Sequence, residues 1–104
     1  DFTYIDDLIH GIILAVDNED AKNQTFNLTY GESRTIGKMA EVLKDSFKNI
    51  NINYIPKDTL TPDRGTLNIN KAKDLLGYAP KYSIEGGYPL YIKWYKDFYK
   101  NLKK

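Results

Sequence analysis

The chain has 104 residues, and its 15 Lys and Arg against 14 Asp and Glu give a net charge of +1, which does not indicate a nucleic-acid binder. Apolar residues make up 41% and charged residues 28%, a composition typical of one globular domain and unlike that of a disordered protein. Because there is no cysteine, no membrane-length apolar run and no signal-peptide pattern, disulfide scaffolds, thiolate metal sites and membrane spans are excluded, and a small cytoplasmic domain is expected.

Residues 1–8 read as a strand that runs into a helix. Since chain ends usually fray and domains seldom begin inside an element, this start indicates a piece of a longer protein. Aromatic and β-branched residues between positions 2 and 5 suit the strand, and Asp6 or Asp7 suits the N-cap of the helix. Apolar residues then follow at helical spacing and predict an amphipathic helix of about ten residues. They are Leu8, Ile9, Ile12, Ile13 and Val16.

The middle of the chain predicts two more short strands around a second helix. Residues 17–23 are polar and predict a loop, residues 25–28 suit a strand, and residues 30–32 suit a turn. Thr35 is expected to N-cap the helix. The apolar face of that helix comprises Ile36, Met39, Ala40, Leu43 and Phe47. Apolar residues alternate with asparagine over residues 50–55, which predicts a half-buried strand.

The C-terminal half predicts two further helices. The connection over residues 56–65 is long enough to carry function. Asn70 is expected to cap a short helix that Gly77 ends. Ser83 begins the last helix, and Pro89, which has no backbone N–H, predicts a late start or a kink. The apolar stripe of this helix comprises Tyr91, Trp94, Tyr95, Phe98 and Leu102.

These elements predict an α+β fold, a single domain over residues 1–104 with about four helices and two or three short strands. Charge is divided unevenly along it. Residues 1–35 carry seven acidic and two basic side chains, whereas residues 36–104 carry seven acidic and thirteen basic ones. Such opposed lobes suit an anion at one end, although solvated surface is the commoner explanation.

No complete active site is recognisable from the residues alone. His10 is the sole histidine, which excludes a histidine metal cluster. Tyr99 and Lys103 form a Tyr-x-x-x-Lys pair, but nine tyrosines and many lysines make such a pair expected by chance, and it lies at the chain end. We therefore do not interpret it as catalytic. Aromatic and lysine side chains mix on the last helix, but their separate faces favour core docking over nucleic-acid binding.

Arg64 and Thr35 are the candidate ligand-binding residues. A guanidinium offers a planar fork of donors to a phosphate, and the neighbouring Gly65 lets the backbone approach a ligand. Thr35 would add a hydroxyl and free N–H groups at a helix N-terminus. A solvated arginine and a simple N-cap are the structural alternatives, and both stay open at this point.

Four segments together resemble the extended short-chain dehydrogenase family, the NAD-dependent nucleotide-sugar epimerases and dehydratases. The most specific, from Arg64 to Lys81, is similar to the family's Asp-Ile-Ser-Lys-Ala-Lys-x-Leu-Leu-Gly-Tyr-x-Pro-Lys segment. Asp-Phe-Thr-Tyr-Ile-Asp-Asp-Leu at residues 1–8 resembles the family's Asp-Phe-x-Tyr-Val-x-Asp stretch. The other two segments are residues 25–36, with Thr29 in place of a usual glycine, and Ser83-Ile-Glu-Gly-Gly with the later Ile-Lys-Trp-Tyr.

The resemblance implies a C-terminal, substrate-binding portion whose Rossmann domain is absent. Family members bind NAD on a Gly-x-x-Gly-x-x-Gly run and use a Tyr-x-x-x-Lys catalytic pair in that domain; this chain has no such glycine run. NAD is thus expected in the parent enzyme and not on this chain, and the chain alone is expected to be inactive. Its expected partners are a UDP- or dTDP-linked sugar and its own Rossmann domain, with no nucleic acid and no membrane.

The resemblance also implies the site residues. Arg64 matches the family's arginine at the nucleotide-sugar diphosphate, Thr35 matches a polar position of the same site, and Phe2 and Tyr4 belong to the strand beside it. The alternative is a stand-alone binding or interaction module without catalysis. That alternative predicts a monodisperse protein with no large apolar surface, whereas the fragment hypothesis predicts an exposed apolar face and non-native self-association.

Overall fold

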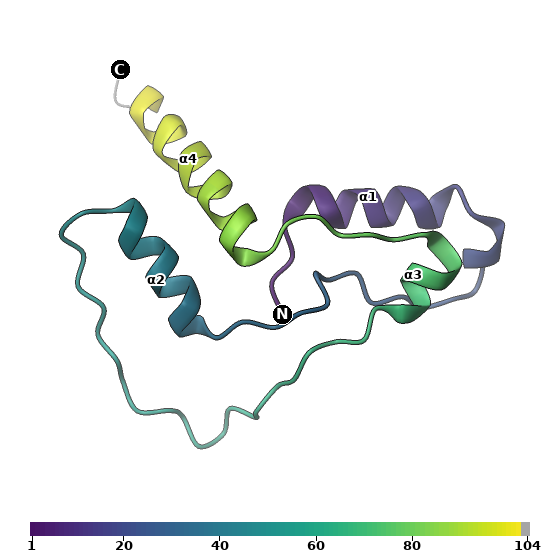
Figure 1. Cartoon of the computed structure of the whole chain (residues 1–104), viewed down its shortest axis with the longest axis horizontal. Coiled ribbons are helices and arrows are strands. Elements are labelled where there is room, and N and C mark those ends of the chain that lie inside the picture. The colour runs from purple at the N-terminus through teal and green to yellow at the C-terminus, as the bar shows by residue number, and fades with distance from the viewer. Residues whose placement is uncertain (103–104) are drawn as a thin grey trace.

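The computed structural model describes residues 1–102, which form four α-helices joined by extended segments (Figure 1). The helices are α1 (Ile5–Val16), the 3-10 turn η1 (Glu19–Ala21), α2 (Ile36–Ser46), α3 (Asn70–Leu76) and α4 (Ile84–Leu102). Because residues 1–102 contain no strand, the expected α+β fold is wrong. The described residues form a small helical fold.

The three segments expected as strands are extended or irregular but pair with nothing. Tyr4 has extended backbone angles, φ −76° and ψ 143°, and the helix begins at the next residue. Residues 25–28 contact the chain before α3 through a side chain, since Asn27 Nδ2 donates to the carbonyl of Asn68 at 3.0 Å. A strand requires a neighbouring backbone to complete its ladder, and residues 50–55 lie in an open loop (Figure 1).

The core of the molecule lies between α1 and α3. Gly11 of α1 lies close against this core, because a Cβ there would stand 2.9 Å from both Tyr78 Cε2 and Leu28 Cδ2. The buried core residues are Ile69, Ala72, Leu76 and Tyr78, against which Leu14, Ala15, Ala21, Phe26 and Leu28 pack. Residues of α1, of η1 and of the extended segment 25–28 thus pack around the short α3.

Helices α2 and α4 form the other packed pair. Lys96 lies over the ring of Phe47, 4.3 Å from its centroid, where α2 ends. The radius of gyration is 17.0 Å, whereas a compact chain of this length has about 13 Å. The shape is therefore open, with extents of 50 × 43 × 20 Å.

Several helix boundaries confirm the sequence predictions, and three do not. Thr35 caps α2, accepting a hydrogen bond from Lys38 N at 3.1 Å, and Gly77 ends α3 with φ +67°. Neither Asp6 nor Asp7 is a cap, since α1 begins at the residue before them, and Asn70 is the first residue of α3 and not its cap. The late start of α4 is also wrong, because Pro89 lies within the helix. Because Pro89 has no backbone N–H, a carbonyl in the first turn of α4 lacks its hydrogen bond within the helix, and the rest of the helix is unaffected.

Aromatic side chains run along one face of α4. The ring of Trp94 stacks between those of Tyr91 and Phe98, with centroid separations of 5.7 Å and 5.3 Å. Tyr95 and Tyr99 form a second, tilted pair at 4.5 Å. Of the helices in residues 1–102, none combines the length and apolar character needed to cross a bilayer.

Candidate functional site

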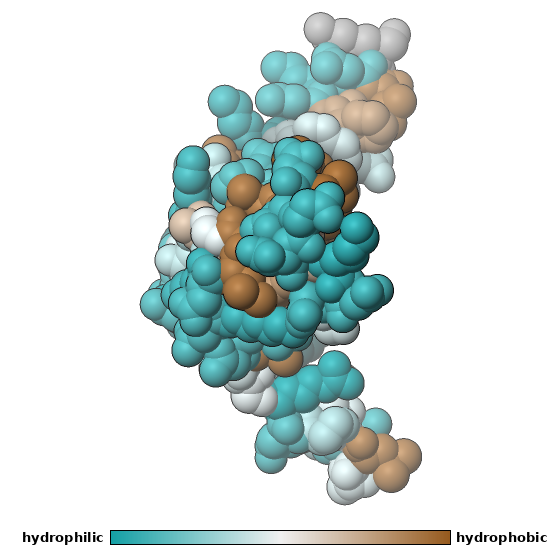
Figure 2. Space-filling view, turned by 90° about the vertical axis from the view of Figure 1, so that its right-hand side faces the viewer, coloured by the Kyte–Doolittle hydropathy of each residue, from teal (hydrophilic) through white to brown (hydrophobic). Residues whose placement is uncertain are grey.

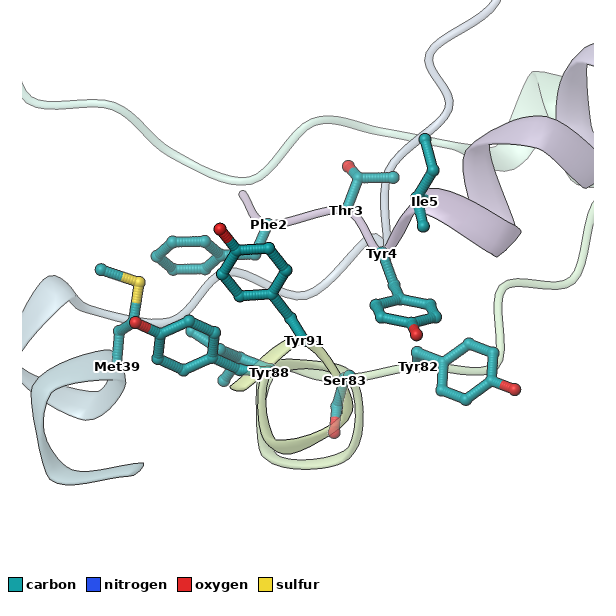
Figure 3. A pocket seen from close by; sticks show the side chains of 11 residues that line it. Phe2, Thr3, Tyr4, Ile5, Met39, Tyr82, Ser83, Tyr88 and Tyr91 are labelled. Atoms are coloured by element: carbon teal, nitrogen blue, oxygen red, sulfur yellow. The ribbon is translucent and has the colours of Figure 1, made fainter. Parts of the chain in front are cut away.

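An apolar cavity of about 250 Å³ lies where the N-terminal segment meets α2 and α4 (Figure 3). The rings of Phe2, Tyr88 and Tyr91 face into this space, with Met39 of α2 at its side (Figure 3). The remaining lining residues are Thr3, Tyr4, Ile5, Tyr82, Ser83, Ile84 and Gly87. The cavity therefore offers aromatic faces and a few hydroxyl groups, and no charged side chain.

Tyr4 forms one wall of this cavity and is tightly held. Its ring lies 4.6 Å from that of Tyr82, centroid to centroid, and a Cβ on Gly87 would stand 2.9 Å from Tyr4 Cδ2. Desolvation by burial raises the pKa of the Tyr4 phenol, and the negative charge of Asp6 raises that pKa further. The Tyr4 phenol is therefore neutral at ordinary pH, a form whose hydroxyl can donate or accept a hydrogen bond.

The carboxylate of Asp1 joins three segments that are far apart in the chain. Asp1 Oδ2 accepts hydrogen bonds from Leu67 N at 2.7 Å and from Thr29 Oγ1 at 3.3 Å. Thr29 is buried, and its hydroxyl also accepts from Gly31 N at 3.1 Å. Three segments therefore meet at Asp1, which directly precedes Phe2 of the cavity lining. They are residues 1–4, the turn before α2 and the loop that follows Arg64.

Thr35 and Arg64 lie outside the lining of the cavity. The hydroxyl of Thr35 is engaged as the cap of α2, and its side chain is exposed. The loop of Arg64 is hydrogen-bonded to the segment of Thr35 through neighbouring residues. The hydroxyls of Ser33 and Thr66 share a hydrogen bond, and Ser33 N donates to Thr66 Oγ1 at 3.3 Å. The two predicted ligand residues are thus on adjoining segments.

Arg64 itself is exposed, and within the part of the chain that the structure describes it forms no ion pair. A Cβ on Gly65 would meet nothing within 4 Å, so no close approach of protein atoms requires glycine there. The guanidinium is therefore free to meet an anionic ligand. The rejected Tyr99–Lys103 pair is not assessed, because Lys103 lies outside the described residues.

Sequence reasoning missed the other arginine. Arg34 Nε donates to Glu85 Oε1 at 3.0 Å and Arg34 Nη2 to Glu32 Oε2 at 3.2 Å, which links the turn before α2 to the first turn of α4. The hydrogen bond to Glu85 raises the pKa of Arg34, and the pKa of Glu85 is lowered by its own backbone N–H and then by Arg34. The chain has only two arginines, so the rarity of this residue could have drawn attention to Arg34 as well as to Arg64.

Two further aromatic residues of the cavity were missed for another reason. Tyr88 and Tyr91 were read as part of a helix, and only the folded chain places them opposite Phe2. Asp7 was also missed: its buried carboxylate accepts backbone hydrogen bonds from Lys81 and Tyr82, both at 2.9 Å. These bonds fix the segment that leads into the cavity wall.

Comparison with known proteins found relatives over almost the whole chain. UDP-glucuronic acid decarboxylase 2 of Arabidopsis thaliana is 31% identical over 97 residues, which are 92% of this chain and 21% of the relative. UDP-glucuronate 4-epimerase 4 of the same plant is 27% identical over 119 residues, 100% of this chain and 27% of the relative. A Bacillus subtilis protein described as an uncharacterized UDP-glucose epimerase is 28% identical over 100 residues, 95% of this chain and 32% of the relative.

The chain thus spans between a fifth and a third of the length of these curated relatives. No family model matches it, and no solved structure does. The relatives nevertheless confirm the resemblance that its four sequence segments carry.

Proposed function

We propose that this chain, a homologue of the extended short-chain dehydrogenases that act on nucleotide sugars, forms the nucleotide-sugar-binding portion of an NAD-dependent epimerase or dehydratase. It holds the nucleoside diphosphate so that C4 of the sugar reaches the cofactor on a Rossmann domain. This is an orienting role, and orientation alone accounts for a large part of the rate of a reaction between two bound groups. The parent enzyme acts in the cytoplasm.

The convergence of three segments at Asp1 is the observation that supports this proposal best. Three of the four segments that carry the family resemblance are distant in the chain, yet the hydrogen bonds of Asp1 to Leu67 and Thr29 bring them to one place. The exposed Arg64 stands on one of these segments and Thr35 on another. A shared junction of this kind suits a site that recognises one ligand with several loops.

The chemistry of the residues suits the two ends of a nucleotide sugar. Arg64 offers paired donors to the diphosphate, since a guanidinium binds phosphate oxygens in a bidentate way. The exposed hydroxyl of Thr35 lies at the N-terminus of α2, where free N–H groups also favour an anion. The aromatic cavity beside Phe2 and Tyr4 suits a flat, largely uncharged group such as a base. UDP- and dTDP-linked sugars are the ligands of this class.

NAD chemistry belongs to another part of the enzyme. The chain has no Gly-x-x-Gly-x-x-Gly run, so its residues do not fit the site that holds the dinucleotide in this family. The chain alone is therefore inactive as an epimerase or dehydratase. Turnover of UDP-glucose or UDP-glucuronic acid by the purified chain with added NAD would contradict this statement.

The alternative, a stand-alone binding module, predicts little exposed apolar surface. Large apolar side chains are instead exposed on α1, on α4 and in the loop between α2 and α3. In that loop, Tyr54, Ile55 and Leu60 are each more than four-fifths exposed. This surface supports the proposal that the chain works as part of a larger enzyme.

A titration followed by NMR tests the site. We expect UDP-glucose to shift amide signals around Arg64 and Thr35, and we expect Arg64→Ala to abolish these shifts. Lys57→Ala is the matched control, because Lys57 is a cation of the same loop that already pairs with Asp63. Unchanged spectra of the wild-type chain at millimolar UDP-glucose, or equal shifts in both variants, would contradict the assignment.

A further inference from the structure

Helix α1 is apolar on two sides, and the fold covers only one of them. One side carries Gly11, Leu14 and Ala15, which pack on the α1–α3 core or approach it closely. The other side carries an apolar stripe that is between 47% and 78% exposed and comprises Ile5, Ile9, Ile12, Ile13 and Val16. A helix that is hydrophobic all round is normally buried all round. The stripe of α1 therefore lacks a covering layer.

The amount of surface points the same way. The chain exposes 8303 Å², whereas a compact protein of 12.0 kDa exposes about 6000 Å². The excess, about 2300 Å² on that scale, is larger than the roughly 800 Å² that a standard interface buries on each partner, and it falls in the range of large, obligate interfaces. Figure 2 views the end of the molecule that carries η1 and α3, and apolar surface runs there through a mostly polar face.

We propose that the apolar stripe of α1 is the docking surface for the polypeptide that the relatives carry outside the matched segment, so that α1 is a central helix between two layers. The inference rests on the proposed function, and it names the surface by which the two parts of the enzyme meet. Its occupant is ample in size, because 68% to 79% of each relative lies outside the match. Aliphatic, β-branched side chains suit the interior of a protein better than a nucleotide site.

The charge around the stripe argues against a second copy of this chain as the occupant. Exposed acids flank both ends of α1, with Asp6 near its start and Asp17, Glu19 and Asp20 after its end. A two-fold pairing on α1 applies the same surface to itself and brings these acids toward one another. Like charges across an interface disfavour association. The occupant therefore has an apolar surface with a neutral or basic rim.

Single cysteines report directly on this surface, because the chain contains none. We would compare the chain with the full product of its gene, using Ile12→Cys on the stripe and Lys73→Cys, an exposed position on α3, as the matched control. Iodoacetamide labelling is read peptide by peptide with mass spectrometry. We expect the thiol at position 12 to react about tenfold more slowly in the full product, because burial limits reaction to transient opening, and the thiol at position 73 to react equally in both.

Every result of this comparison decides the question. Equal rates at position 12 in both proteins would overturn the proposal, as would a gene that encodes nothing beyond these residues. Protection at position 12 that grows with the concentration of the chain, together with a dimeric mass, would assign the stripe to a second copy and also overturn it. Val16→Cys repeats the measurement at the most exposed position of the stripe. Labelling needs no ligand, so a failure of nucleotide-sugar binding at Arg64 leaves this test intact.

Discussion

Asp7 and Tyr82, 75 positions apart, are joined by a hydrogen bond of 2.9 Å from the backbone nitrogen of Tyr82 to the buried carboxylate of Asp7. The second oxygen of the carboxylate accepts from Lys81 N at the same distance. One side chain of α1 thus holds the segment that leads into α4. Because Tyr82 also contacts the ring of Tyr4, the pair fixes one wall of the aromatic cavity.

Removing this carboxylate is expected to destabilise the fold strongly. Asp7→Ala leaves two backbone N–H groups without an acceptor, and the lost bonds to a charged group cost about 3 kcal/mol or more in the free energy of unfolding. Urea denaturation followed by circular dichroism measures this change. Asp6→Ala is the matched control, because Asp6 is the exposed neighbour and should change stability by about 0.5 kcal/mol or less. Equal effects of the two substitutions would contradict the role of Asp7.

Two glycine substitutions are expected to act with opposite sign. In Gly11→Ala the new methyl group meets Leu28 and Tyr78 at 2.9 Å, and such overpacking costs about 1–3 kcal/mol. In Gly37→Ala the methyl group meets only Thr35 Oγ1 at 3.6 Å, and alanine in a helix is favoured by about 1 kcal/mol. Chemical denaturation of the two variants should therefore move the midpoint down for the first and up for the second. A stable Gly11→Ala protein would show that α1 and Tyr78 do not pack this closely.

The hydroxyl of Tyr78 is expected to weaken the fold. Tyr78 is 1% exposed, and its hydroxyl is buried without a hydrogen-bond partner. An unsatisfied buried polar group costs about 1–3 kcal/mol, so Tyr78→Phe should raise the midpoint of thermal unfolding. A lower midpoint would mean that the hydroxyl has a partner in solution, such as an internal water molecule.

Tyr78 also gives the fold an alkaline pH dependence. Burial raises the pKa of its phenol above the ordinary value of 10.0, and the negative charge of Asp7 adds to the rise. In the unfolded chain the phenol loses its proton near its ordinary pKa, so the unfolded state is favoured once the pH exceeds that value. The stability from neutral Tyr78 is therefore fully present below about pH 10 and is lost as the pH rises toward the folded-state pKa.

Unfolding free energies measured between about pH 8 and pH 11 test this dependence. Tyr78→Phe should flatten the fall, and Tyr4→Phe should remove a further part, since the pKa of Tyr4 is raised as well. Tyr54 is 81% exposed, so Tyr54→Phe should leave the slope unchanged. A slope that all three variants leave intact would exclude buried tyrosines as its source.

Local sequence signals predicted the helices well and the strands badly. The N-cap at Thr35 and the glycine at Gly77 act within a few residues, so the boundaries that they set could be read from the sequence. Alternation over residues 50–55 indicates only that a segment is extended and half-buried. A strand exists only if another backbone lies beside it, and no such neighbour lies beside these residues in the described chain.

Phe2 and Tyr4 were predicted as site residues from the family resemblance of the first segment, and both line the cavity. Their part in binding a nucleotide sugar stays a prediction. The ion pair that joins Arg34 to α4 depends on Glu85, 51 positions away, and no local pattern encodes that contact. The placement of Arg64 against a phosphate remains a prediction.

The single tryptophan gives the molecule a built-in reporter. Trp94 lies in the aromatic row of α4, half exposed and stacked between Tyr91 and Phe98. Its fluorescence will therefore follow the solvent around α4 and nothing on α1. Excitation energy absorbed by Tyr91 will also transfer to the indole of Trp94. Tryptophan emission after tyrosine excitation will therefore show whether the aromatic row of α4 is intact. Tryptophan fluorescence thus reports on α4, whereas cysteine labelling reports on α1.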